Sequence, residues 1–282
     1  MNASNPQLTE IQDALQNGRV VPYIGPGALG LIADPGVPAT PEALAALLTA
    51  RASVPHKIRK RLTQAAQFIE NFKHRKTIVA LMNESFAPDV PPSPLLLALA
   101  ALPRLPLLVD TWYDSASQQA LAGRRSWGQV QGLSQSEHFG TWTGYFDAAG
   151  QPAAAAAAAS WQSVLYKPLG GVRPAGNYLV SDSDFVEVLT EIDIQTPIPP
   201  VVIERRAGRG FLFLGCRFTD QLQRSFARQI MKRSADVHWA VLPGALTRNE
   251  ARFLAEQNIR RLDMTLEAFS AAYAGRELSC AS

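Results

Sequence analysis

Apolar residues along the chain fall into two alternating patterns, which predict alternating strands and helices. Short continuous apolar runs predict buried strands at 19–24, 106–109, 163–166, 210–215 and 238–242. Apolar residues at helical spacing predict helices over 7–17, from about 40, and over 58–72, 76–86, 93–102, 183–189, 219–233, 247–257 and 264–273. This alternation predicts an α/β protein with a Rossmann-like, doubly wound parallel sheet.

Residues 123–160 interrupt this pattern. They contain glycines, serines and scattered aromatic residues without a strand or helix period. We therefore expect an irregular insertion within a single domain spanning residues 1–282. Because aromatic side chains dominate binding hot spots, residues 139–146 are a candidate protein interface, although they could instead cover the open end of the sheet.

Composition indicates a packed globular protein. The chain has 282 residues, of which 47% are hydrophobic and 18% charged. It has no apolar run of the roughly 20 residues that a membrane span needs, and its first residues lack the pattern of a signal peptide. We expect a cytoplasmic protein without a membrane partner. Cys216 and Cys280 are far apart in the sequence, so we expect neither a disulfide framework nor a metal site.

The formal charge is +3, and the basic residues form local clusters, such as 57–61 and 73–76. Arg224, Arg228 and Lys232 recur at every fourth position and therefore share one helix face. Such a face can meet an acidic partner, or it can simply be solvated. We do not expect nucleic acid to be the partner.

The most informative local motif is a glycine loop between the first strand and a helix. Gly25, Gly27 and Gly30 have the spacing that allows a backbone to approach a pyrophosphate and offer it amide N–H groups. Pro26 removes one of those donors. No second strand ends in an acidic residue about 20 positions later, so the dehydrogenase fingerprint is incomplete. The alternative is a glycine-rich turn without a ligand.

Further motifs follow in a fixed order. The segment 23–29 stands where one family has Gly-Ala-Gly-x-Ser, and Gly36-Val37-Pro38 where it has Gly-Leu-Pro. Residues 110–114 (Asp-Thr-Trp-Tyr-Asp) match a Thr-Thr-Asn-Tyr-Asp signature, and residues 167–170 (Lys-Pro-Leu-Gly) stand at a Lys-Leu-His-Gly signature. Asp184-Phe185 and residues 213–220 correspond to a later helix start and glycine turn. Over residues 19–242 the chain thus resembles the SIR2-like family, relatives of the sirtuins that include bacterial NAD-consuming defence proteins.

This resemblance implies that NAD, or an ADP-ribose-like nucleotide, lies across the strand ends. The positions that it marks for cofactor contact are Gly25, Gly27, Ala28, Asp114, Gly215 and Arg217. The first two glycines would approach the pyrophosphate, and Gly215 the ribose or adenine end. Arg217 could bind phosphate or pair with Asp220.

The departures from the family pattern bear on activity. Trp112 and Leu169 stand at the family's catalytic asparagine and histidine, and neither side chain can accept a proton. The Cys-x-x-Cys pairs of deacetylating sirtuins are absent, and His138 is the histidine that could fold over the pocket. We expect no catalytic residue, and a catalytically degenerate domain that senses a nucleotide or binds a protein partner. An active NAD-hydrolysing enzyme and a scaffold without ligand are the alternatives.

Overall fold

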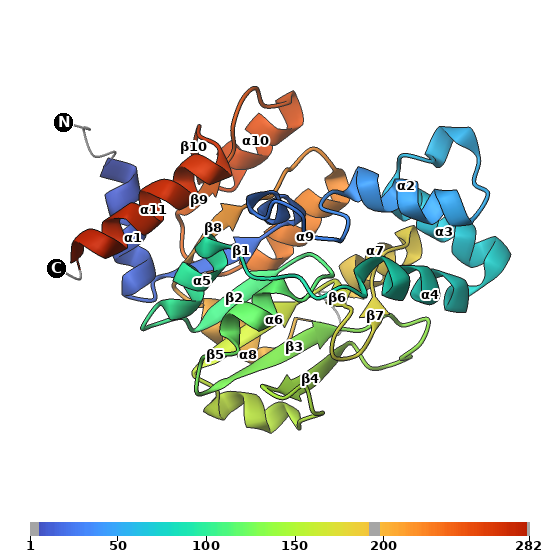
Figure 1. Ribbon diagram of the computed structural model, residues 1–282, viewed down its shortest axis with the longest axis horizontal. Helices are drawn as coiled ribbons and strands as arrows, with labels where there is room; N and C mark the ends of the chain where they lie inside the picture. Colours follow the sequence, from blue (N-terminus) through green and yellow to red (C-terminus); the bar gives the residue numbers. More distant parts are fainter. Residues whose placement is uncertain (1–5, 192–197, 281–282) are drawn as a thin grey trace.

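The computed structural model describes residues 6–191 and 198–280, and within them an eight-stranded sheet forms the centre of the molecule (Figure 1). Its strands are β1 (Val20–Ile24), β2 (Leu107–Asp110), β3 (Trp127–Gly132), β4 (Thr143–Asp147), β5 (Ser163–Lys167), β8 (Gly210–Leu214), β9 (His238–Val241) and β10 (Ile259–Leu262). Their order is β10-β9-β8-β1-β2-β5-β3-β4, and every pairing is parallel except that of β3 with β4. A small antiparallel pair, β6 (Gly170–Gly171) and β7 (Asn177–Tyr178), lies beside this sheet.

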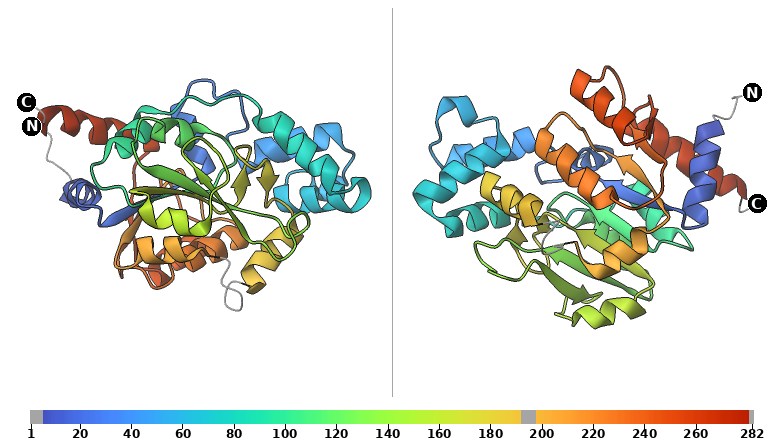
Figure 2. Two further views of the ribbon diagram at one scale, coloured as in Figure 1. Left: turned by 90° about the horizontal axis from the view of Figure 1, so that it is seen from below. Right: turned by 180° about the vertical axis from the view of Figure 1, so that it is seen from behind.

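Helices cover both faces of the sheet, as Figure 2 shows. One core contains α1 (Pro6–Gln16), α5 (Pro94–Ala101), α6 (Ala116–Leu121) and α11 (Leu266–Cys280). The other contains α7 (Asp182–Glu191), α8 (Pro200–Arg206), α9 (Gln221–Met231) and α10 (Arg248–Glu256). Side chains of one strand divide between the two cores, since Val20 and Ile24 join the first and Val21 and Tyr23 the second. Within the described ranges no helix is both long and apolar enough to cross a membrane.

The strand order places a chain reversal at the middle of the sheet. From β1 the chain builds β2 and β5 on one side, and it later returns to add β8, β9 and β10 on the other. In doubly wound folds the crevice at such a reversal, outside the carboxyl ends of the strands, is where ligands bind. The sheet is therefore Rossmann-like, and the reversal between β1 and β8 marks the place to look for a site.

A helical module lies at one end of the molecule, next to these strand ends (Figure 1). It consists of α2 (Pro41–Arg51), α3 (Leu62–Lys73) and α4 (Arg75–Phe86). The short 3-10 helix η1 (Pro26–Leu31) precedes α2, and η2 (His56–Ile58) lies between α2 and α3. The remaining 3-10 helix is η3 (Ala155–Ser160). The module belongs to the first core, where Leu48, Ile69 and Met82 are buried.

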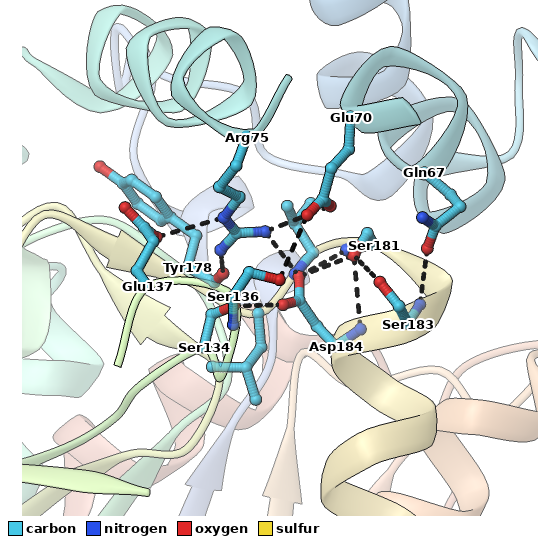
Figure 3. A network of polar contacts seen from close by, with 12 residues as sticks. Gln67, Glu70, Arg75, Ser134, Ser136, Glu137, Tyr178, Ser181, Ser183 and Asp184 are labelled. Atoms are coloured by element: carbon cyan, nitrogen blue, oxygen red, sulfur yellow. Dashed lines mark hydrogen bonds and ion pairs between the residues drawn. The ribbon is translucent and has the colours of Figure 1, made fainter. Parts of the chain in front are cut away.

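Arg75 fixes the helical module to the rest of the protein (Figure 3). Its guanidinium forms ion pairs with Asp184 at 3.0 Å, Glu137 at 3.2 Å and Glu70 at 3.5 Å, and it donates a hydrogen bond to the carbonyl of Tyr178. The Asp184 side chain is fully buried. A buried carboxylate of this kind needs its partner, so the Arg75 contacts hold α4 against α7 and the loop after β3.

The structure confirms the α/β class and the strands expected from apolar runs, but residues 123–160 are not irregular. They contain β3, which pairs with β5 in parallel, and β4, which completes a hairpin at the sheet edge. The expectation was wrong because β3 buries polar side chains, which hide its strand pattern. Gln131 donates to the carbonyls of Gly171 and Asn177, and Gln129 donates to Gln131 and to the carbonyl of Arg173.

Gly128 in β3 offers a test of this packing. A Cβ atom at this position would overlap the indole ring of Trp161, whereas a Cβ at Gly123 would meet nothing within 4 Å. We expect Gly128→Ala to lower the free energy of unfolding by about 1–3 kcal/mol, because overpacking displaces a ring that is itself buried. Gly123→Ala is the matched control and should leave it unchanged or slightly raised. Equal denaturation midpoints for the two variants would show that this packing is not as described.

Candidate functional site

A cleft of about 670 Å³ opens at the chain reversal, above the carboxyl ends of the parallel strands. Gly25, Trp112, Leu169 and Gly215, which come from four separate segments of the sequence, all line it. The strand ends form its floor. The starts of α2 and α3 lie on the module side, and the start of α9 completes the wall. The cleft has the size of small-molecule and cofactor sites.

The glycine loop on the floor packs against the turn after β8. The amide of Gly25 donates to the carbonyl of Leu214 at 2.8 Å, and that of Gly27 to the carbonyl of Gly215 at 2.9 Å. A Cβ at Gly25 or Gly27 would lie 2.6 or 2.8 Å from the Gly215 oxygen. The glycines are therefore required by contact between two loops of the protein itself.

These bonds change what the loop can offer a ligand. Ala28 is buried and does not line the cleft, and its amide donates to the carbonyl of Gly25. Since Pro26 has no N–H, the amides of residues 25–28 provide no free donor to the cleft. The structure thus differs from the expectation that amides of this loop cradle a phosphate.

Trp112 forms part of the wall. Its indole N–H donates to the carbonyl of Pro38 at 2.8 Å, and its ring packs edge-on against Phe86. Only 4% of the residue is exposed. Leu169 lies on the same cleft and is half-buried. Because the one polar hydrogen of the indole is committed to Pro38, neither residue can take or give a proton in the cleft.

None of the four histidines of the chain, each within the described ranges, lines the cleft. His56, His74 and His138 are exposed elsewhere. His238 lies in β9 and accepts a hydrogen bond from the amide of Phe211, while burial lowers its pKa to about 4. The sequence-based expectation that His138 could fold over the pocket is not met.

The buried phenols and the thiol of the wall are poor bases near neutral pH. Burial raises the pKa of the Tyr23 and Tyr113 phenols, and it raises the pKa of the Cys216 thiol well above its usual range. The carboxylates that line the cleft are those of Glu42 and Asp220. Asp220 accepts hydrogen bonds from the amides of the first turn of α9.

Asp114 lies beneath the cleft and does not line it. Its carboxylate accepts a hydrogen bond from the amide of Ala116, and its carbonyl accepts one from the buried ammonium of Lys167. Lys167 also forms an ion pair with Asp110 at 2.8 Å. Burial, together with the nearby charge of Asp110, raises the pKa of Asp114 to about 6. This cluster supports the loop that carries Trp112.

Arg217 lines the cleft, but its charge is already paired. Its Nε lies 3.0 Å from Glu250, and a second nitrogen donates to the carbonyl of Pro243. Burial opposes ionisation of Glu250, yet hydrogen bonds from Thr247, Arg217 and the amide of Phe218 lower its pKa below the usual range. The partner of Arg217 is therefore Glu250 and not Asp220, which the sequence had suggested.

Sequence reasoning missed two cations on the module side of the cleft. Lys60 and Arg61 precede α3, line the cleft and are exposed. Neither side chain has a hydrogen-bond or ion-pair partner among residues 6–191 and 198–280. The basic run at 57–61 was visible in the sequence, but nothing local indicated which of its members would face the strand ends.

Comparison with known proteins identifies one family. A model described as a SIR2-like domain matches residues 106–262, which is more than half of the chain and includes Trp112, Leu169 and Gly215. No curated protein gave a significant match. A solved structure from work on the structural basis for the mechanism and regulation of Sir2 enzymes aligns with 97% of this chain and 100% of its own, at 11% identity and a TM-score of 0.39.

The Asp114 cluster predicts a specific pH dependence of stability. Because the folded-state pKa of Asp114 is raised to about 6, its ionisation weakens the folded state as the pH rises from about 4 through 6. Asn can still accept the hydrogen bond from Ala116 without the buried charge. We expect Asp114→Asn to raise the Tm at pH 7.5 and to have almost no effect at pH 4.

The matched variant is Asp110→Asn, which removes the charge that pairs with Lys167. It should lower the Tm throughout this pH range, because it leaves a buried ammonium without its counter-ion. Thermal unfolding followed by circular dichroism at several pH values measures both. A Tm difference for Asp114→Asn that does not change with pH would contradict the raised pKa.

Proposed function

Because the chain belongs to the SIR2-like family, we propose that it is a catalytically degenerate member that keeps a nucleotide-binding cleft and acts as a nucleotide-sensing component of a complex. The observation that carries the proposal is the identity of two cleft-lining residues. By the sequence resemblance, Trp112 and Leu169 stand where the family has its catalytic asparagine and histidine, and both line the cleft at the strand ends.

Cleavage of the bond between nicotinamide and ribose needs a polar group beside the ribose and a base or an orienting group for the attacking oxygen. In this cleft Leu169 offers no polar atom, and the indole N–H of Trp112 is bonded to Pro38. No histidine of the described ranges lines the cleft. General acid–base help is worth roughly 10²–10⁴ in rate, so its loss supports the proposal that the domain binds a nucleotide without turning it over.

The nucleotide that we propose is NAD or an ADP-ribose-like molecule, with no metal. The volume of the cleft, about 670 Å³, falls in the range for ligands of this size. Its position at the chain reversal is where Rossmann-like sheets bind nucleotides. Gly25, Gly27 and Gly215 lie on the floor of the cleft, where their backbone atoms can contact the ligand although the amides of Gly25 and Gly27 are not free.

The proposal predicts binding without hydrolysis. The unmodified protein should release no nicotinamide from NAD above a heat-denatured control, while millimolar NAD or ADP-ribose should raise its Tm in a concentration-dependent way. Nicotinamide release is followed by chromatography and the Tm by thermal unfolding. Clear turnover would overturn the hypothesis that the domain is catalytically degenerate. The variant Glu42→Gln would then test whether the carboxylate of Glu42, which is exposed and lines the cleft, acts as the base. No shift of the Tm would remove the nucleotide from the proposal.

Phe139 favours a protein partner for the same domain. It is 95% exposed in the loop between β3 and β4, and this loop is held at Glu137 by the ion pair with Arg75. A large apolar side chain presented to solvent on a fixed loop is suited to a binding hot spot. We propose that the loop of residues 133–142 contacts the partner.

In native extracts the protein should migrate in an assembly larger than the isolated chain, and Phe139→Ser should shift it to the size of that chain. Phe72→Ser is the matched control, because Phe72 is also exposed, at 67%, but lies on α3. Native gel migration with immunodetection measures both variants. An assembly that survives Phe139→Ser, or that Phe72→Ser disrupts equally, would exclude this loop as the contact.

A further inference from the structure

We infer that Lys60 and Arg61 form the subsite that binds the anionic group of the ligand, in place of the glycine loop. The inference rests on the proposed function, because it assigns the phosphate-binding role within the same cleft. The anionic group is a diphosphate. The inference also predicts which part of the cleft that group occupies, namely the side formed by the helical module.

The first support is that the glycine-loop amides and the other basic group of the cleft are already paired within the protein. The amides of Gly25 and Gly27 are bonded to the turn after β8, and Pro26 has none. Arg217 is paired with Glu250 at 3.0 Å. A diphosphate in the cleft must therefore find its positive charge elsewhere. Among the residues that the structure describes, Lys60 and Arg61 are the remaining basic side chains that line the cleft.

The second support is that these two cations are uncommitted, whereas the acidic side chains beside them have other roles. The carboxylate of Asp220 caps α9 by accepting from the amides of Leu222 and Gln223. Glu42 lies in the first turn of α2, where a carboxylate offsets the positive end of the helix dipole. Lys60 and Arg61 have no such partner in the described part of the chain.

The third support is geometric. Lys60 and Arg61 lie on the helical module, across the cleft from the strand ends, and the Arg75 contacts fix that module in place. No side chain of the described residues caps the start of α3, which directly follows Arg61. A ligand that spans from the strand ends to the module would therefore meet apolar walls near Trp112 and positive charge at Lys60.

The test compares Lys60→Gln and Arg61→Gln with Lys57→Gln. Lys57 is an exposed lysine of the same basic run that does not line the cleft. The Lys57→Gln variant therefore removes one positive charge of the run without changing the subsite. All three side chains are exposed, so the variants should fold normally. Titration calorimetry with ADP-ribose, adenosine and inorganic pyrophosphate provides the readout.

We expect each cleft variant to weaken ADP-ribose binding about tenfold and to reduce its salt dependence, as loss of one charge-assisted contact does. Adenosine binding, and every affinity of Lys57→Gln, should stay unchanged. ADP-ribose binding that is equal in wild type and both cleft variants would overturn the inference and leave the proposed function standing. Weaker adenosine binding in the variants would also overturn it, because that would indicate a disturbed module.

Pyrophosphate binding distinguishes a failure of the nucleotide proposal from a failure of the subsite proposal. If pyrophosphate binds and depends on Lys60 and Arg61 while ADP-ribose does not bind, the subsite stands and the nucleotide fails. If the wild-type protein binds neither, both proposals are overturned.

Discussion

The contact between the glycine loop and the turn after β8 is the constraint on which the site depends. Two backbone hydrogen bonds, from Gly25 to Leu214 and from Gly27 to Gly215, join the ends of neighbouring strands at the chain reversal. The contact is so close that a Cβ at Gly215, whose φ is +68°, would overlap the amide of Ala28. Glycine at all three positions lets the two loops meet, and the floor of the cleft is the surface that this meeting creates.

The cleft consequently has two chemically different sides. On the floor and the adjoining wall, polar groups are used within the protein, as the indole of Trp112 bonds Pro38 and the guanidinium of Arg217 pairs with Glu250. On the module side, Lys60 and Arg61 keep their charges available to solvent. The family match begins at residue 106, so these cations lie in a part of the chain outside the matched segment.

The sequence was sufficient for the fold class because buried parallel strands such as Gly210–Leu214 are apolar throughout and are bounded by clear turn residues. It failed at β3, where Gln129 and Gln131 are buried and fully hydrogen-bonded, since a strand that buries amides has no apolar signal. The expected landmarks Trp112 and Leu169 could be found because they sit directly after strands. The role of the glycines and the exposure of Lys60 could not, since both depend on which distant segment packs opposite.

The hydrogen bond from Trp112 to Pro38 also limits which substitutions position 112 can tolerate. The indole fills a buried space against Phe86 and supplies the donor for a backbone carbonyl 74 residues away in the sequence. Replacement of Trp112 by a smaller residue such as asparagine would leave a void and would withdraw that donor, so the change would lower the stability of the fold. Selection for a stable fold should therefore disfavour single substitutions at position 112, whatever the cleft binds.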